Sequence, residues 1–372
     1  MSPGERTPPS RLASRQAQRP ARLTRTELRQ PDGRRLYLYG QYEPAPPGYV
    51  APRQADGTYE RRWNPLRREW VLVAVGRQGR TFLPDAANCP LCASRPGHST
   101  EVSASRFQLA VFENRFPAMP SFPCPARGGG QGGGTCEVVV YSDQHDGSMA
   151  TLGEARIREL VEVWSDRYRE LAARPDVRYI LIFENRGEAV GVTLHHPHGQ
   201  IYGYPFIPPV AKTELQAGQA FARDGKGCLQ CSLITTERSD GSRMLFDVGG
   251  VAAYVPSYAR WPYEVHLAPR AHYGALPDLP ARSRTALAAA LSRVTSAYDR
   301  LFDQPLPYMM VIHQRPTDGK IHPSAHLRVE FYPVMWGPGR LKYLAAGENG
   351  AGTFVSDSLP EEKASQLRAR KT

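Results

Sequence analysis

Three imidazoles and an amide lie close together at residues 195–200, which read His-His-Pro-His-Gly-Gln. In an extended strand successive side chains point to opposite faces, so His196, His198 and Gln200 would share one face. A neutral imidazole is a good nucleophile near pH 7, and attack by His198 on phosphorus would split a difficult displacement into easier steps. The Gln200 amide could bind the phosphoryl oxygen on which charge builds up. A metal site that uses His195 or His198 is the alternative for these residue types.

Two Cys-x-x-Cys pairs indicate metal binding rather than disulfides, because the sequence shows no export signal. Paired thiolates with distant imidazoles are the ligands that a tetrahedral Zn2+ ion prefers, so we predict zinc in a closed, structural site and ligands for a second such site. The first set is Cys89, Cys92, His145 and His196, and the second is Cys228, Cys231, His272 and His326. Redox pairs or core thiols are the alternative, and His322 competes for a place in the second site.

The other cysteines, Cys124 and Cys136, flank a glycine-rich run at residues 128–134. This run has too little side chain to pack, so we expect a flexible loop there. We predict that both cysteines are unpaired thiols.

The elements that must position these residues occur twice along the chain. Short strands are predicted at residues 69–75, 136–141 and 179–183, and an amphipathic helix at 151–171. The Cys-x-x-Cys pair recurs after 139 residues, the apolar helix face after 130 residues with the same steps of 4, 3, 4 and 3, and the strand at 180–183 as 309–312. The sequence therefore predicts an α+β fold of two duplicated units, each a mostly antiparallel sheet with a covering helix.

The second copy keeps the metal-position histidine but not the reactive one. It reads His-Leu-Arg-Val-Glu at residues 326–330, so Arg328 matches His198 and Glu330 matches Gln200. The duplication predicts one working centre in the first copy and a supporting second copy, which also argues against a further metal site at His195 or His198.

The composition suits one large or two ordinary domains, with 372 residues of which 41% are hydrophobic and 22% charged. No apolar run is long enough to span a membrane, and we predict a cytoplasmic protein without a membrane partner.

Much of the net charge of +11 lies in residues 1–35, where nine arginines and three acidic residues predict a disordered leader. We expect a catalytic half at 36–210, a second half at 211–350 and a tail at 351–372. A non-catalytic nucleic-acid-binding protein would leave the motif at 196–200 unexplained, so we do not expect nucleic acid as a partner.

From about Arg61 to Arg368 the sequence resembles the galactose-1-phosphate uridylyltransferases, a family of the histidine-triad superfamily. The resemblance rests on Asn-Pro-Leu at 64–66, Glu-Trp-Val-Leu-Val at 69–73, Cys-Pro-Leu-Cys at 89–92, Val-Phe-Glu-Asn-Arg-Phe-Pro at 111–117, the segment 137–145, Phe-Glu-Asn-Arg-Gly at 183–187 and His-Pro-His-Gly-Gln at 196–200. In combination with the other motifs, the motif at 196–200 is highly specific for this family. The resemblance implies that both halves are histidine-triad-like units.

The resemblance also implies a ping-pong reaction through a uridylyl-histidine intermediate. His198 would attack the α-phosphorus of UDP-glucose and release glucose 1-phosphate, and galactose 1-phosphate would then take the uridylyl group. The other ring nitrogen of His198 would donate to the backbone carbonyl of His196, which fixes the tautomer. The family's phosphate contacts fall on Arg77, Arg80, Asn185, Thr193 and Gln200.

The second half departs from part of the family. Some members bind iron through a glutamate and three histidines, and Glu214 and His313 match two of these ligands. Because Arg328 and Glu330 occupy the adjacent histidine positions, we expect no iron. The pattern instead resembles a two-zinc branch, which includes an ADP-glucose phosphorylase relative.

The family's sugar-site positions fall on Lys342 and Glu348, although Gly347 replaces a tyrosine. Such residues are often reached across a dimer interface, so the resemblance implies a homodimer. The leading hypothesis is a uridylyltransferase of galactose metabolism that uses UDP-glucose and galactose 1-phosphate. The alternative is a nucleotide-sugar phosphorylase, similar to ADP-glucose phosphorylase, which retains the covalent step and uses inorganic phosphate as acceptor.

Overall fold

The computed structural model describes residues 23–53, 57–121, 124–127 and 131–370, and its largest element is a single sheet. The first half of the chain contributes β1 (Arg25–Arg29), β2 (Arg35–Pro44), β5 (Ala104–Glu113), β8 (Thr135–Val140), β9 (Tyr179–Arg186) and β10 (His198–Tyr204). The second half contributes β11 (Met244–Val248), β12 (Val251–Tyr254), β13 (Val265–Pro269), β14 (Tyr308–His313) and β15 (Arg328–Pro333).

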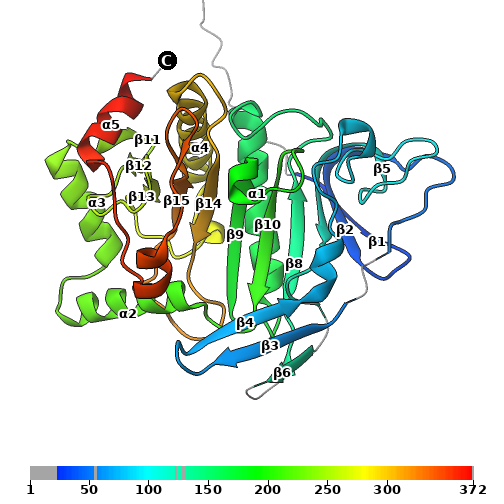
Figure 1. Ribbon diagram of the computed structural model, residues 1–372, viewed down its shortest axis with the longest axis horizontal. Helices are drawn as coiled ribbons and strands as arrows, with labels where there is room; N and C mark the ends of the chain where they lie inside the picture. Colours follow the sequence, from blue (N-terminus) through cyan, green and yellow to red (C-terminus); the bar gives the residue numbers. More distant parts are fainter. Residues whose placement is uncertain (1–22, 54–56, 122–123, 128–130, 371–372) are drawn as a thin grey trace, which may run out of the picture.

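These strands form one 11-stranded sheet in the order β1-β2-β5-β8-β10-β9-β14-β15-β13-β12-β11. Its neighbouring strands pair antiparallel. The two copies join between β9 and β14, where Glu184 faces Met310, so the duplicated units share one continuous sheet (Figure 1). The predicted α+β class and mostly antiparallel arrangement are confirmed.

Each copy provides one long helix to the main core. These helices are α1 (Gly153–Ala172) and α4 (Ala281–Leu301), which lie side by side near the middle of the sheet (Figure 1). The predicted apolar faces are buried in both, which confirms the two covering helices. The residues of the predicted faces, all buried, are Ile157, Val161, Trp164, Tyr168 and Leu171 in α1, and Leu287, Leu291, Val294, Tyr298 and Leu301 in α4.

A second, smaller sheet has four strands, all from the first half of the chain. It has the order β4-β3-β6-β7 and consists of β3 (Tyr59–Asn64), β4 (Glu69–Ala74), β6 (Cys124–Arg127) and β7 (Gln131–Gly132). A short 3-10 helix at Val75–Gly79 follows β4. The loop predicted at residues 128–134 is partly replaced by β7, and residues 128–130 lie outside the described ones.

The remaining helices belong mainly to the second half: α2 (Pro209–Arg223), α3 (Leu229–Asp240) and α5 (Pro360–Ala369). A hairpin joins β16 (Met335–Gly337) to β17 (Arg340–Leu341), and a π-helical turn spans Gly347–Ala351. Short 3-10 turns occur at Ala86–Asn88, Glu188–Val190 and Leu276–Asp278. Within the described ranges, no helix is long and apolar enough to cross a membrane.

The predicted disorder of residues 1–35 is wrong from Arg25 onward, and residues 1–22 lie outside the described ones. β1 pairs with β2 over its whole length. The Arg25 guanidinium lies 4.4 Å from the Tyr37 ring centroid and 3.0 Å from the Asp166 carboxylate, and it also forms an ion pair with Glu170. Because Asp166 and Glu170 lie on α1, the positive charge of Arg25 is neutralised by acidic groups far along the chain.

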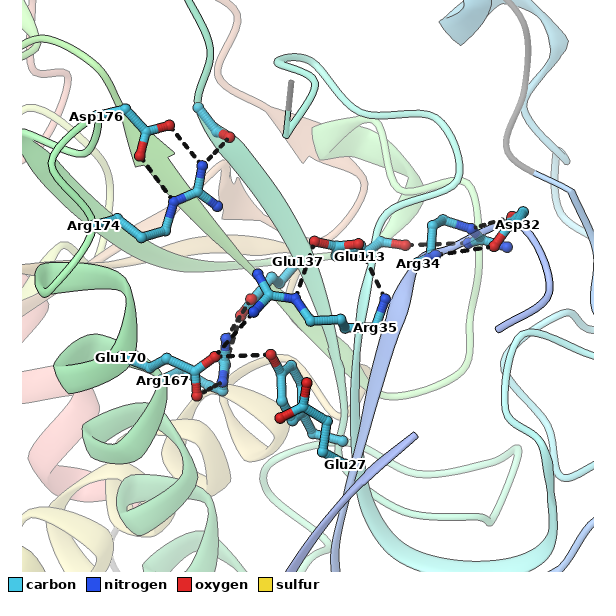
Figure 2. Close-up of polar contacts among 12 residues, drawn as sticks. Glu27, Asp32, Arg34, Arg35, Glu113, Glu137, Arg167, Glu170, Arg174 and Asp176 are labelled. Atoms are coloured by element: carbon cyan, nitrogen blue, oxygen red, sulfur yellow. Dashed lines mark hydrogen bonds and ion pairs between the residues drawn. The ribbon is translucent and has the colours of Figure 1, made fainter. Parts of the chain in front are cut away.

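Glu170 also belongs to a more deeply buried group of charged residues, which includes Arg167 and Glu137 (Figure 2). Arg167 of α1 donates two hydrogen bonds, at 2.9 and 2.6 Å, to the carboxylate of Glu137 on β8, and both side chains are almost fully buried. Glu170 accepts a hydrogen bond of 2.8 Å from the Tyr37 hydroxyl. A bidentate pair of this kind satisfies both buried charges, so the cluster ties α1 to β1, β2 and β8.

Candidate active site and metal centres

β10 begins with the predicted nucleophile. Strand β10 lies between β8 and β9, and its residue Gln200 pairs with Val138 of β8 on one side and with Phe183 of β9 on the other. His198 and Gln200 are half-buried, whereas the alternate residues of β10 are buried on the opposite face. The structure therefore brings His198 and Gln200 to one face, while His196 precedes the strand and its ring turns to the first cysteine pair.

The His198 ring has a defined tautomer. Its Nδ1 lies 2.7 Å from the backbone carbonyl oxygen of His196. Because a carbonyl oxygen only accepts, Nδ1 donates the proton and Nε2 carries the free lone pair. Burial lowers the pKa of His198, although the hydrogen bond to His196 opposes this effect. His198 is therefore a neutral imidazole with Nε2 available for attack at pH 7.

Four of the predicted phosphate-contacting residues line one pocket together with His198. They are Arg77, Arg80, Thr193 and Gln200. Arg77 Nη1 donates to the Phe116 carbonyl at 3.1 Å, and Arg80 Nε donates to the Arg77 carbonyl at 3.1 Å. Burial and the neighbouring charge of Arg77 lower the pKa of Arg80. Two neighbouring guanidinium groups make this part of the pocket suitable for an anionic diphosphate.

The other part of the pocket contains residues for which the sequence predicts no role. Apolar side chains there are Pro90, Leu91, Phe112, Phe116, Val138 and Leu194, and the polar ones are Thr81, Glu101, Asn114 and Arg115. Several belong to the motif at 111–117, but neither spacing nor residue type reveals that this motif faces His198. Pro90 and Leu91 lie between the cysteines of the first metal cluster, so the turn between these cysteines forms part of the wall of this pocket.

Asn185 lies on β9 and lines a second pocket that also contains His198. His198 therefore borders two pockets. The charged groups of Lys342 and Glu348 lie 3.6 Å apart, and neither residue lines the two described pockets that contain His198. Their predicted role in sugar binding thus depends on the predicted dimer.

The first metal cluster brings together all four predicted ligands, Cys89, Cys92, His145 and His196. Cys92 Sγ lies 3.4 Å from His145 Nδ1 and 3.5 Å from His196 Nδ1. A tetrahedral zinc ion separates sulfur and nitrogen ligands by about 3.5 Å, so the donor set fits Zn2+. His196 Nε2 lies 2.8 Å from the Ser142 carbonyl oxygen, which directs Nδ1 toward the thiols.

The second cluster repeats this arrangement with Cys228, Cys231, His272 and His326. Cys231 Sγ lies 3.4 Å from His326 Nδ1, and His326 Nε2 lies 2.8 Å from the Pro269 carbonyl oxygen. His322 is not in this cluster and instead pairs with Asp318 at 2.8 Å. The donor chemistry and distances of both clusters therefore fit zinc.

The remaining histidine and cysteines of the sequence predictions are His195, Cys136 and Cys124. His195 is exposed and lies 3.5 Å from Glu188, and no group of possible ligands among the described residues includes His195 or His198. Cys136 is a buried free thiol, whereas the side chain of Cys124 lies outside the described part of the structure. The alternative of a metal site that uses His195 or His198 thus has no cluster among the described residues to support it.

A third group of possible ligands contains Glu214, His313 and Glu330, but an arginine lies among them. The Arg328 guanidinium forms hydrogen bonds with Glu214 and, at 2.5 Å, with Glu330. Although burial opposes the shift, the charge of Arg328 holds the pKa of Glu330 well below its usual value. The chain's own arginine therefore supplies the positive charge here, and the absence of iron stays a prediction.

Family models and known proteins match this sequence over most of its length. The family models for the galactose-1-phosphate uridyl transferase N-terminal and C-terminal domains match residues 49–208 and 215–370. A galactose-1-phosphate uridylyltransferase from Thermotoga maritima is 37% identical over 317 residues, which cover 83% of this chain and 98% of that protein. A relative of the same name from Streptomyces lividans is 36% identical over 301 residues, which cover 79% and 81% of the two proteins.

Solved structures show the same relationship. A uridylyltransferase structure superposes with a TM-score of 0.72 at 31% identity and covers 83% of this chain and 97% of that one. An ADP-glucose phosphorylase from Arabidopsis thaliana shares the fold, with a TM-score of 0.64 at 20% identity and coverage of 84% and 99%. Sequence models, relatives and fold together show that the chain belongs to the galactose-1-phosphate uridylyltransferase family.

Proposed function

We propose that this protein is a UDP-glucose:hexose-1-phosphate uridylyltransferase that exchanges UMP between glucose 1-phosphate and galactose 1-phosphate. The observation that carries the proposal is the neutral His198, with a free Nε2, in a pocket shared with Arg77, Arg80 and Gln200. The names of the Thermotoga maritima and Streptomyces lividans relatives support this choice of substrates.

The first half-reaction transfers the uridylyl group to the protein. His198 Nε2 attacks the α-phosphorus of UDP-glucose, the bond between that phosphorus and the bridging oxygen breaks, and glucose 1-phosphate leaves with the electron pair. Arg77 and Arg80 bind the anionic phosphates, and the Gln200 amide donates to a non-bridging oxygen. Because a phosphate oxygen is a stable leaving group, this step requires no proton from the protein.

The second half-reaction reverses these bond changes with another acceptor. A phosphate oxygen of galactose 1-phosphate attacks the same phosphorus, the phosphorus–nitrogen bond breaks, and UDP-galactose is released. The electron pair returns to Nε2, so His198 is again a neutral imidazole. Its Nδ1 donates to the His196 carbonyl throughout, which keeps Nε2 directed at phosphorus.

The two Cys/His clusters are proposed as structural zinc sites. Each has four protein donors, so bound zinc supplies cross-linking and no open coordination position. In the first cluster, His196 contributes both a ligand nitrogen and the carbonyl that orients His198. The cluster therefore fixes the tautomer and position of the nucleophile without touching the substrate.

Product analysis tests the proposed reaction. Purified protein is mixed with UDP-glucose and galactose 1-phosphate, and separately with UDP-glucose and inorganic phosphate, and the products are identified by mass spectrometry. We expect UDP-galactose in the first mixture only, together with continuous production of glucose 1-phosphate, whereas the second mixture releases no more than one glucose 1-phosphate per uridylylated chain. UDP in the second mixture would instead establish a phosphorylase.

We also propose that the protein acts in the cytoplasm and forms a homodimer. Light scattering of the full chain tests the dimer.

A further inference from the structure

A buried carboxyl group joins three strands beneath the start of β10. Glu184 on β9 is 5% exposed and accepts hydrogen bonds from the hydroxyls of Tyr141 and Tyr308, both at 2.9 Å. Tyr141 follows β8, and Tyr308 begins β14 in the second half of the chain. Both tyrosines are fully enclosed, so these hydrogen bonds fix the two rings relative to β9.

β10 rests directly on this group at Gly199. A Cβ atom there would overlap the Tyr141 hydroxyl, and it would lie 3.0 Å from the Phe183 carbonyl oxygen and 3.2 Å from Tyr141 Cζ. The space that a side chain would need is thus taken by the hydroxyl that Glu184 binds. Because Gly199 lies between His198 and Gln200, any shift of its backbone moves both groups.

We propose that Tyr141, Glu184 and Tyr308 form a clamp that positions His198 and Gln200 through Gly199. The clamp residues are positioning residues, because they act through the backbone of β10. Tyr308 also gives the second copy, which has Arg328 in place of a nucleophile, a direct part in supporting the first copy's active site. The proposal rests on the proposed function only in taking His198 as the nucleophile.

The charge state of Glu184 gives the clamp a measurable signature. Burial raises the pKa of Glu184 to about 7, while the hydrogen bonds from Tyr308 and Tyr141 and the charge of Arg186 oppose this effect. Arg186 is held by Asp299 of α4, with Nη2 at 3.0 Å from a carboxylate oxygen. Removing one tyrosine hydroxyl removes a hydrogen bond to the ionised form, so the pKa of Glu184 rises further. A variant in the clamp is therefore expected to lose activity at a higher pH than the wild type as the solution is acidified.

The first experiment compares Tyr141→Phe and Tyr308→Phe with Tyr298→Phe. Tyr298 is a matched control, because it is equally buried and its hydroxyl donates to the Tyr263 carbonyl at 2.8 Å. All three variants lose one buried hydroxyl hydrogen bond, so similar losses of thermal stability are expected.

The measurements are kcat, KM and the rate of uridylyl-enzyme formation between pH 5 and 9. A misplaced nucleophile slows the covalent step more than it weakens binding. We expect the Tyr141 and Tyr308 variants to lose about tenfold or more in that rate, with KM nearly unchanged and the acid limb shifted upward. The Tyr298 variant is expected to match the wild type. Equal rates and equal pH profiles in all three variants would overturn the clamp.

The second experiment uses suppression. Gly199→Ala is expected to lose at least as much of the rate of His198 labelling as the tyrosine variants, because the added methyl group displaces β10. Tyr141→Phe in the same chain removes the hydroxyl that the methyl group meets, so part of the rate is expected to return. A double variant no faster than Gly199→Ala would contradict the proposal.

These results separate the clamp from the proposed reaction. Labelling of His198 at wild-type rates in the clamp variants would overturn the clamp and leave the uridylyltransferase intact. Labelling of His198 by another nucleotide sugar would overturn the proposed substrates, and slower labelling of the clamp variants by that sugar would still support the clamp. If no nucleotide sugar labels His198, both proposals fall.

Discussion

Replacing Arg328 by Met removes the only arginine that bridges the Glu214 and Glu330 carboxylates among the described residues. Removing one partner of a buried ion pair costs about 3–5 kcal/mol, because the remaining charge is left without compensation. Glu330 is 6% exposed in its side chain but Glu214 is 35% exposed, and His313 still lies 3.3 Å from Glu214. We therefore expect the lower end, about 3 kcal/mol, which corresponds to a fall in Tm of about 4 °C for a chain of this size.

The pH dependence of this loss identifies its cause. In the wild type the charge of Arg328 outweighs burial, so the folded-state pKa of Glu214, at about 2, lies below the unfolded value. The stabilisation is fully present above the unfolded pKa of about 4.3 and is lost progressively as the pH falls toward the folded-state value. Without Arg328, the largest charge that opposes burial is lost, so the pKa values of both carboxyl groups rise above those in the wild type. The folded variant then takes up protons at a higher pH than the folded wild type, so its deficit in stability relative to the wild type is expected to shrink as the pH falls.

Differential scanning calorimetry at pH 8 and pH 5 measures the Tm difference from the wild type. Arg282→Met, at an exposed position of α4, is the control for loss of an arginine and is expected to change Tm little. An Arg328→Met variant as stable as the control at pH 8 would refute the assigned role of Arg328. A deficit that stays constant or grows at pH 5 would also refute it.

Two further changes test the metal ligands and the phosphate contacts. Cys89→Ser is expected to remove one zinc ion per chain and to lower Tm, since ligand loss removes folding free energy, whereas Cys136→Ala is expected to keep the zinc content by atomic absorption. Unchanged zinc in the Cys89 variant would show that the ligands are wrong. Arg77→Gln is expected to lower kcat/KM for UDP-glucose by about tenfold to a hundredfold, because a charge-assisted contact to phosphate is lost. Steady-state assays beside Arg282→Gln check this, and equal effects of the two changes would count against Arg77.

Features that repeat locally could be predicted from the sequence. The steps of 4, 3, 4 and 3 identified both covering helices, and their apolar faces are buried as expected. Doubling of the Cys-x-x-Cys pairs indicated both metal clusters, because ligand type and order survive duplication. Alternation along β10 placed His198 and Gln200 on one face, since the side-chain period of a strand is fixed.

Features that depend on contacts between distant segments could not be predicted. The polar, arginine-rich composition of residues 1–35 predicts disorder, yet Arg25 of β1 pairs with Asp166 and Glu170 on α1. The join of the two copies through β9 and β14, and hence the meeting of Tyr308 with Glu184, requires a strand order that periodicity does not encode. Tertiary pairing decides both cases, and local pattern carries no signal of it.

Intact-mass spectrometry of the protein after exposure to UDP-glucose tests the central claim most directly. The wild type is expected to gain the mass of one uridylyl group, to release glucose 1-phosphate, and to lose the added mass when galactose 1-phosphate is supplied. His198→Asn is expected to gain no mass while its zinc content and Tm stay near those of the wild type, because an asparagine side chain lacks the nucleophilic Nε2 but leaves both metal clusters intact. A uridylylated His198→Asn protein, or turnover that it retains, would contradict His198 as the nucleophile.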